Sequence, residues 1–317
     1  MTLSHYLNLV RREIDTPVIR YLMMAQFPRV LSIQSHVVSG YVGNKSATFP
    51  LQILGFEVDT INSVQFCNHT GYAAVKGQVL TDKDLGDLVE GLATNNLDTN
   101  YSHLLTGYIG SPAFLKRVAS LVIDLKAKNK ELIYVCDPVM GDNGKMYVPA
   151  ELLPIYKEVV IPLADILTPN QYEVELLTER KIKTVEDAWK SIDILHDIGC
   201  KTVFLSSSEL GSEGNLLALA STIKGERKRV IMSIPKLNAT FTGTGDLFAS
   251  LLLAWMYSTD DIQLAMDKTM ATIQHVLQKT LKYASVIGIS TGSLELKLIQ
   301  CKEEIQEPKV TVHSKLT

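Results

Sequence analysis

The segment Gly243-Thr244-Gly245-Asp246 carries the residue types of an anion-binding helix start. It directly precedes an apolar run, residues 247–256, which has no internal Gly or Pro and is long enough for a buried helix. The first N–H groups of a helix have no intrahelical partner, and the helix dipole adds partial positive charge there. Glycines let a phosphate approach these donors closely. The segment therefore predicts a phosphate cradle formed by Gly243, Thr244 and Gly245.

Asp246 suits proton transfer better than phosphate binding, because its negative charge repels a phosphate. At this position it could accept the proton of a hydroxyl group that attacks the phosphate. The helix dipole is expected to favour the ionised, proton-accepting form of Asp246. The alternative is that Asp246 only caps the helix, and these four residues alone do not decide between the two.

Two further polar clusters follow predicted strands. Asp137-Pro138-Val139-Met140-Gly141-Asp142 places two carboxylates after one strand, which suits Mg²⁺ held partly through water and substrate phosphates. Thr168-Pro169-Asn170-Gln171-Tyr172-Glu173 follows the next strand and enters a helix. A solvated acidic turn and simple helix capping are the alternatives. Because ligands collect at the carboxyl ends of parallel strands, three such clusters favour one shared site.

Strand and helix patterns alternate from residue 29 onward. We expect strands at 30–33, 56–62, 103–106, 132–136, 164–167 and 202–205, and helices near 46–54, 81–92, 111–128, 184–199, 244–256 and 260–284. Segments 216–221 and 230–234 flank a charged turn and predict an antiparallel hairpin at a sheet edge. The succession indicates an α/β fold: a mostly parallel central sheet with helices on both faces.

No composition shift marks a second domain, so residues 29–317 are expected to form one domain. Residues 1–28 are predicted to be an extension outside the core. They mix Arg with Glu and Asp and lack the apolar region of a secretory signal, and the acids disfavour a mitochondrial one. Residues 302–317 are polar and are expected to be loosely attached.

Composition narrows the function classes. A formal net charge of −3 gives no electrostatic reason to expect nucleic acid, and no Lys/Arg block suggests a membrane surface. No apolar run is long enough to span a bilayer. The four cysteines form no CxxC pair and are typical of free thiols in a reducing compartment.

Two motifs are set aside. Residues 39–46 look like a Walker loop, but the spacing between the second glycine, the lysine and the serine does not fit that motif. His36, His69 and His103 do not have metal-ligand spacing. His69 stands beside Thr70 in a polar turn and could contact a ligand.

Taken together, the three clusters resemble those of the ribokinase-type small-molecule kinases. More specifically, the chain is similar to the pyridoxal kinases in five ordered segments, at residues 32–36, 40–44, 62–66, 68–72 and 105–108. The similarity runs from about residue 29 to the C-terminal region. It implies a ribokinase-like fold and ATP-dependent phosphorylation of the 5′-hydroxyl of pyridoxal, pyridoxine and pyridoxamine. It also implies Mg²⁺ or another divalent metal, and a cytosolic homodimer.

The resemblance also implies residue roles. Asp246 corresponds to the catalytic base, Gly243, Thr244 and Gly245 to the anion hole, and Ser35, Thr70 and Tyr108 to the vitamin pocket. The implied ATP-binding residues are Asn170, Glu173, Ser206, Ser207, Leu237, Asn238, Ala239, Thr244 and Gly245. Asp142 would lie near Mg²⁺, while Asp137, Thr168 and Ser206 would surround a monovalent cation, K⁺ or Na⁺. Ser206 stands where a threonine is expected and keeps the hydroxyl.

Two other functions stay open at this point. A related hydroxymethylpyrimidine or sugar kinase would share the Gly243–Asp246 motif, although the surroundings of Ser35, Thr70 and Tyr108 disfavour it. A non-catalytic pyridoxal phosphate carrier would keep the pocket, although an intact Asp246 and Asp142 disfavour it.

Overall fold

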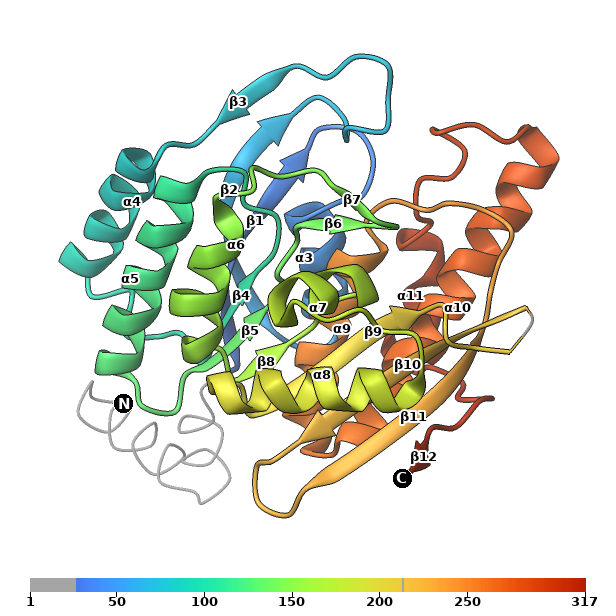
Figure 1. Ribbon diagram of the computed structural model, residues 1–317. Helices are drawn as coiled ribbons and strands as arrows, with labels where there is room; N and C mark the ends of the chain where they lie inside the picture. The colour runs from blue at the N-terminus through green and yellow to red at the C-terminus, as the bar shows by residue number, and fades with distance from the viewer. Residues whose placement is uncertain (1–26, 213) are drawn as a thin grey trace, which may run out of the picture.

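A ten-stranded sheet organises the computed structural model, which describes residues 27–212 and 214–317 (Figure 1). Its strands, in spatial order, are β12 (Lys315–Leu316), β11 (Lys228–Pro235), β10 (Asn215–Thr222), β9 (Thr202–Ser208), β8 (Ile166–Leu167), β5 (Ile133–Cys136), β4 (His103–Thr106), β1 (Arg29–Val37), β2 (Glu57–Phe66) and β3 (Gly77–Val79). The predicted extension lies outside the described residues except for Phe27 and Pro28.

The centre of the sheet is parallel, and its margins are antiparallel. Strands β9, β8, β5, β4, β1 and β2 pair in parallel, whereas β3 at one side and β10, β11 and β12 at the other pair antiparallel. The predicted hairpin is the β10–β11 pair. The sequence pattern therefore identified both the parallel core and the antiparallel side.

Helices cover both faces of the sheet, as predicted. One face carries α4 (Asp82–Thr94), α5 (Pro112–Lys128), α6 (Leu152–Ile155), α7 (Gln171–Thr178) and α8 (Val185–Ile198). The other carries α3 (Asn44–Ile53), α9 (Thr244–Thr259), α10 (Ile262–Ile287) and α11 (Lys302–Gln306). Successive strand residues alternate between the two cores: Leu104 packs in the first and Leu105 in the second. Short π- and 3₁₀-helical segments lie at Tyr156–Val160, Ile161–Leu163 and Ile299–Cys301.

Local sequence signals set several helix ends. Thr81 and Thr184 form capping boxes at the starts of α4 and α8, and Gly199 ends α8. Ser111 caps α5, whose first residue is Pro112. Helix α9 is apolar on nearly all sides because it lies between α3, α10 and the sheet, with Leu247–Trp255 buried. This buried helix holds the Gly243–Asp246 segment at the carboxyl ends of the parallel strands.

Strand β1 is longer than predicted because it continues through polar residues. Its ladder with β2 shifts register between Gln34 and Ser35. Such irregularities re-aim side chains and are common beside active sites. Gln34, Ser35 and His36 are not among the residue types enriched in strands, so pairing with β2 decides their conformation.

The prediction of a loosely attached C-terminal segment is wrong. Strand β12 pairs with β11, and Ile305 of α11 is fully buried. The buried Asp267 accepts hydrogen bonds from the backbone N–H of Ser314 at 2.8 Å and from its hydroxyl at 2.5 Å. A polar segment is held here by a specific buried acceptor, which composition does not reveal.

Candidate active site

The predicted site residues gather around one cavity of about 650 Å³ at the carboxyl ends of the parallel strands. Its lining includes all three clusters and the residues assigned to the vitamin pocket: Ser35, Thr70, Tyr108, Asp137, Asp142, Thr168, Asn170, Glu173, Ser206, Ser207, Gly243, Thr244, Gly245 and Asp246. Residues more than 200 positions apart in the sequence thus share one wall. The three clusters therefore line a single cavity.

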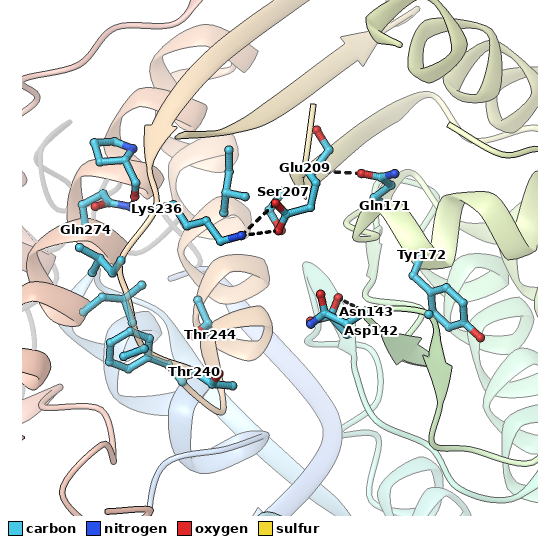
Figure 2. A pocket seen from close by; sticks show the side chains of 18 of the residues that line it. Asp142, Asn143, Gln171, Tyr172, Ser207, Glu209, Lys236, Thr240, Thr244 and Gln274 are labelled. Atoms are coloured by element: carbon cyan, nitrogen blue, oxygen red, sulfur yellow. Dashed lines mark hydrogen bonds and ion pairs between the residues drawn. The ribbon is translucent and has the colours of Figure 1, made fainter. Parts of the chain in front are cut away.

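A second cavity, of about 560 Å³, adjoins the first (Figure 2). Asp142, Ser207 and Thr244 line both cavities. Leu237 and Ala239 line the second cavity, whereas Asn238 between them is exposed and is not among its lining residues. Figure 2 shows Lys236 paired with the carboxylate of Glu209. The backbone N–H of Glu209 donates to the side-chain oxygen of Gln171.

The Gly243–Asp246 segment opens helix α9 with Gly243 at φ 84°. A Cβ atom there would collide with the carbonyl oxygen of Tyr41, so the close approach of the two loops requires glycine. Asp246 makes no capping hydrogen bond. It accepts a hydrogen bond from the backbone N–H of Gly43 at 2.7 Å instead. The interpretation of Asp246 as a simple helix cap is therefore wrong.

The charge state expected for Asp246 also needs correction. Burial raises the pKa of Asp246, and the Gly43 N–H lowers it only in part. The sequence argument counted the helix dipole, which favours the carboxylate, but not the desolvation that disfavours it. A raised pKa makes Asp246 a stronger proton acceptor than an exposed aspartate.

The second and third clusters are tied together by Asn170 and Glu173. These residues form a capping box at the start of α7. The carboxylate of Glu173 also accepts from the backbone N–H of Met140 at 2.9 Å, and the Asn170 amide donates to the Gly141 carbonyl at 2.8 Å. Burial raises the pKa of Glu173 to about 7 against these donors. Asn170 and Glu173 thus cap α7 and also line the first cavity.

Asp137 lies close to Gly245 at the start of helix α9. A Cβ atom on Gly245 would stand 3.5 Å from its Oδ2 atom. Burial raises the pKa of Asp137 well above its usual range, and the carboxylates of Glu173 and Asp246 add to the shift. Such a concentration of buried acids, Asp137, Glu173 and Asp246, fits a metal-bearing site.

No three His, Cys, Asp or Glu side chains within residues 27–212 and 214–317 form a ready-made metal cluster. Mg²⁺ usually takes one or two protein carboxylates and completes its octahedron with water and phosphate oxygens.

Asp142 lines both cavities and lies in a small hairpin formed by β6 (Gly141–Asp142) and β7 (Lys145–Met146). Asn143 and Gly144 form its turn at φ 50° and 77°, the pattern of a tight two-residue hairpin. The Asp142 carboxylate accepts from the backbone N–H of Asn143 at 2.7 Å (Figure 2). The short connection after Asp142 is therefore a defined structure that holds this carboxylate in place.

Some lining residues were missed by sequence reasoning. Phe241, Met270 and Ile273 form part of the apolar wall and carried no local signal. Gly43 contributes a backbone N–H, and it belongs to the glycine-rich segment that the Walker spacing excluded. That segment follows the carboxyl end of β1, as the three clusters follow other strands, and this position could have identified Gly43 as a site residue. His69 lines the first cavity, whereas His103 lies in the core with its pKa lowered to about 4 by burial.

The fold and the paired cavities define a small-molecule kinase, and residues 60–290 match the family model described as phosphomethylpyrimidine kinase. The chain is 49% identical to the pyridoxal kinase of Homo sapiens over 305 residues, which cover 90% of this chain and 97% of that protein. It is 48% identical to the pyridoxal kinase of Arabidopsis thaliana over 93% of this chain and 96% of that one.

A solved structure of pyridoxal kinase from Leishmania donovani in complex with ADP and pyridoxamine superposes with a TM-score of 0.86. It is 34% identical and covers 91% of this chain and 99% of that chain. The chain belongs to the pyridoxal kinase family.

Proposed function

We propose that this protein transfers the γ-phosphoryl group of ATP to the 5′-hydroxyl of pyridoxal, pyridoxine and pyridoxamine, yielding pyridoxal 5′-phosphate from pyridoxal. The observation that carries the proposal is the junction of two cavities at Thr244, with Gly243, Gly245 and Asp246 lining the first cavity beside it. The first cavity combines an apolar wall with hydroxyl groups and carboxylates, which suits a heteroaromatic ring that carries polar groups. The relatives that bear this activity match nearly the whole chain.

The proposed mechanism is an in-line transfer. Ser35, Thr70 and Tyr108 orient the ring so that its hydroxymethyl group points at Asp246. Asp246 accepts the hydroxyl proton as the oxygen attacks the γ-phosphorus atom, and the bond from that phosphorus to the β–γ bridging oxygen breaks to release ADP. The amides of the Gly243–Gly245 segment stabilise the negative charge on the equatorial oxygens. The apolar wall keeps water from competing for the phosphoryl group.

ATP would lie along the second cavity and reach the first at Thr244. The adenine would lie beside Leu237, Asn238 and Ala239. The phosphates would lie between Asn170, Glu173, Ser206 and Ser207 on one side and Thr244 and Gly245 on the other. Asp142 would hold Mg²⁺ or another divalent metal, which when bound neutralises charge on the transferring phosphates.

A monovalent cation, K⁺ or Na⁺, is proposed between Asp137, Thr168 and Ser206. These three oxygen-bearing side chains line one cavity, and Asp137 is 5% exposed with its pKa raised by burial. A bound cation would let the carboxylate ionise. The test is activity in tetramethylammonium chloride against potassium chloride, and equal rates in both salts would remove the site.

The working form is proposed to be a cytosolic homodimer. The four cysteines are free, as expected for a reducing compartment. Among the described residues, no helix combines the length and the apolar character that a membrane span requires. Sedimentation of the purified protein tests the dimer.

The deciding experiment is a coupled assay of ADP release with each B6 vitamer and with hydroxymethylpyrimidine. We expect turnover with the vitamers and little with the pyrimidine. Preference for the pyrimidine would assign the related kinase activity instead. Binding of pyridoxal phosphate without ADP release from any acceptor would make the protein a carrier.

A further inference from the structure

Glu295 is a buried carboxylate that ties together two loops of the first cavity. It lies after α10, and only 9% of the residue is exposed. Its Oε2 atom accepts from the backbone N–H of Tyr41 at 3.0 Å. Its Oε1 atom accepts from the Tyr72 hydroxyl at 3.1 Å and lies 3.2 Å from Nε2 of His69. Three donors from two distant segments therefore meet on one side chain.

The first loop leads to the proposed base. The carbonyl oxygen of Tyr41 packs against Gly243, where a Cβ atom would collide with it. Two residues later, the Gly43 N–H donates to Asp246 at 2.7 Å. The position of Tyr41 thus affects two contacts of this loop, one with Gly243 and one with Asp246.

The second loop forms a wall of the vitamin pocket. His69, Thr70 and Gly71 all line the cavity. Nδ1 of His69 accepts from the backbone N–H of Gly71 at 3.1 Å, so in the neutral ring the proton is on Nε2, which faces Glu295. Glu295 therefore fixes both the tautomer and the orientation of His69, and with them the turn that presents Thr70.

We propose that Glu295 is a positioning residue that holds the catalytic base and the substrate wall in register. The inference rests on the proposed function. Glu295 touches neither substrate nor phosphate in this scheme, and it acts through Tyr41 and His69. Its carboxylate sits directly against Gly40 at φ 96°, where a Cβ atom would collide with both carboxylate oxygens. The backbone itself is therefore shaped to admit this side chain.

Two substitutions test the role by different routes. Glu295→Gln keeps the size but removes the charge and one acceptor, so it cannot satisfy all three donors. Gly40→Ala keeps Glu295 but displaces its carboxylate. Gly55→Ala is the matched control for Gly40→Ala, because Gly55 has φ 89° with nothing within 4 Å of a Cβ atom. Tyr72→Phe removes a single donor from the second loop.

We expect Glu295→Gln and Gly40→Ala to lower kcat/KM for pyridoxal by about tenfold to a hundredfold, the scale of a small misplacement of reacting groups. The KM for ATP should stay within about twofold of wild type, because the second cavity is not touched. Gly55→Ala should lower only the thermal midpoint. A Glu295→Gln variant that loses thermal stability but keeps wild-type kinetics would overturn the positioning role.

A second measurement keeps the inference separate from the proposed function. Hydrogen exchange without ligands should speed up at residues 41–43 and 69–72 in Glu295→Gln, and at 69–72 alone in Tyr72→Phe. If wild type proves inactive with every vitamer, the proposed function fails while this readout still judges Glu295. Unchanged exchange in both loops would refute the coupling.

Discussion

The backbone N–H of Gly43 donates a hydrogen bond to the Asp246 carboxylate at 2.7 Å, across 203 positions of sequence. The bond occupies Oδ2 and leaves Oδ1 available for a substrate hydroxyl. It also limits the rise in pKa that burial imposes on Asp246. The loop after strand β1 therefore orients the carboxylate of Asp246 in helix α9 and affects its pKa.

Asp246→Asn should abolish most activity without harming ATP binding. Asparagine can still accept the Gly43 hydrogen bond, but it cannot take up the hydroxyl proton. A positioned general base contributes about 10²–10⁴-fold, so kcat should fall by that factor. ATP affinity, measured by calorimetry, should hold or improve slightly because a negative charge near the γ-phosphate is removed. Asp260→Asn, at the other end of α9, is the control. Near-wild-type turnover of Asp246→Asn would remove Asp246 from the mechanism.

Thr70→Val should weaken the binding of pyridoxal and leave the binding of ATP unchanged. Thr70 lines only the first cavity. Losing one hydrogen bond costs about 0.5–1.5 kcal/mol, so KM for pyridoxal should rise from a few-fold to about tenfold. Thr240→Val, in the second cavity (Figure 2), should instead act on KM for ATP. A Thr70→Val variant with a raised KM for ATP and an unchanged KM for pyridoxal would assign Thr70 to the wrong cavity.

His103 should make the fold sensitive to acid. It is 4% exposed and packs edge-on against Phe56 and Tyr257, and burial lowers its pKa to about 4. Between that value and about 6.5 the unfolded chain binds a proton that the folded protein does not. The contribution of His103 to the free energy of unfolding is therefore largest above pH 6.5 and falls on acidification, by at most about 3 kcal/mol.

His103→Phe should remove this contribution, because phenylalanine suits the aromatic contacts and Ser102 keeps its hydrogen bonds to Arg29. The measurement is urea unfolding from pH 7 to pH 4.5. The variant should lose less stability over that range than wild type. Parallel curves for the two proteins would show that His103 does not titrate in this way.

A chain that starts at Met24 should keep its activity and its thermal midpoint. Strand β1 begins at Arg29, and Pro28 accepts a backbone hydrogen bond from Glu57 at 2.9 Å, so both remain. A chain that starts at Ser32 is the contrast. It lacks three residues of β1, including the Arg29 that pairs with Asp59 at 3.0 Å, and should unfold at a lower temperature. Loss of activity on removal of residues 1–23 alone would show that these residues are needed for activity.

Local patterns in the sequence determined the elements and the chemical groups. Capping residues such as Thr81, Ser111 and Thr184 act within one turn, and apolar runs such as 133–136 need cover on both faces. Both kinds of signal depend on neighbours in the chain, so they can be read without the fold. The same holds for the three clusters, because each lies where its own strand or helix begins or ends.

Only the tertiary structure decided what those groups experience. The pKa of Asp246 depends on burial by the whole site, the partner of its carboxylate comes from the loop after β1, and Asp267 fixes a tail that composition describes as loose. Glu295 is an ordinary charged residue in the sequence, and it becomes a shared acceptor because two distant segments converge on it. Desolvation and hydrogen bonding between distant segments depend on three-dimensional proximity, which no local pattern of residues encodes.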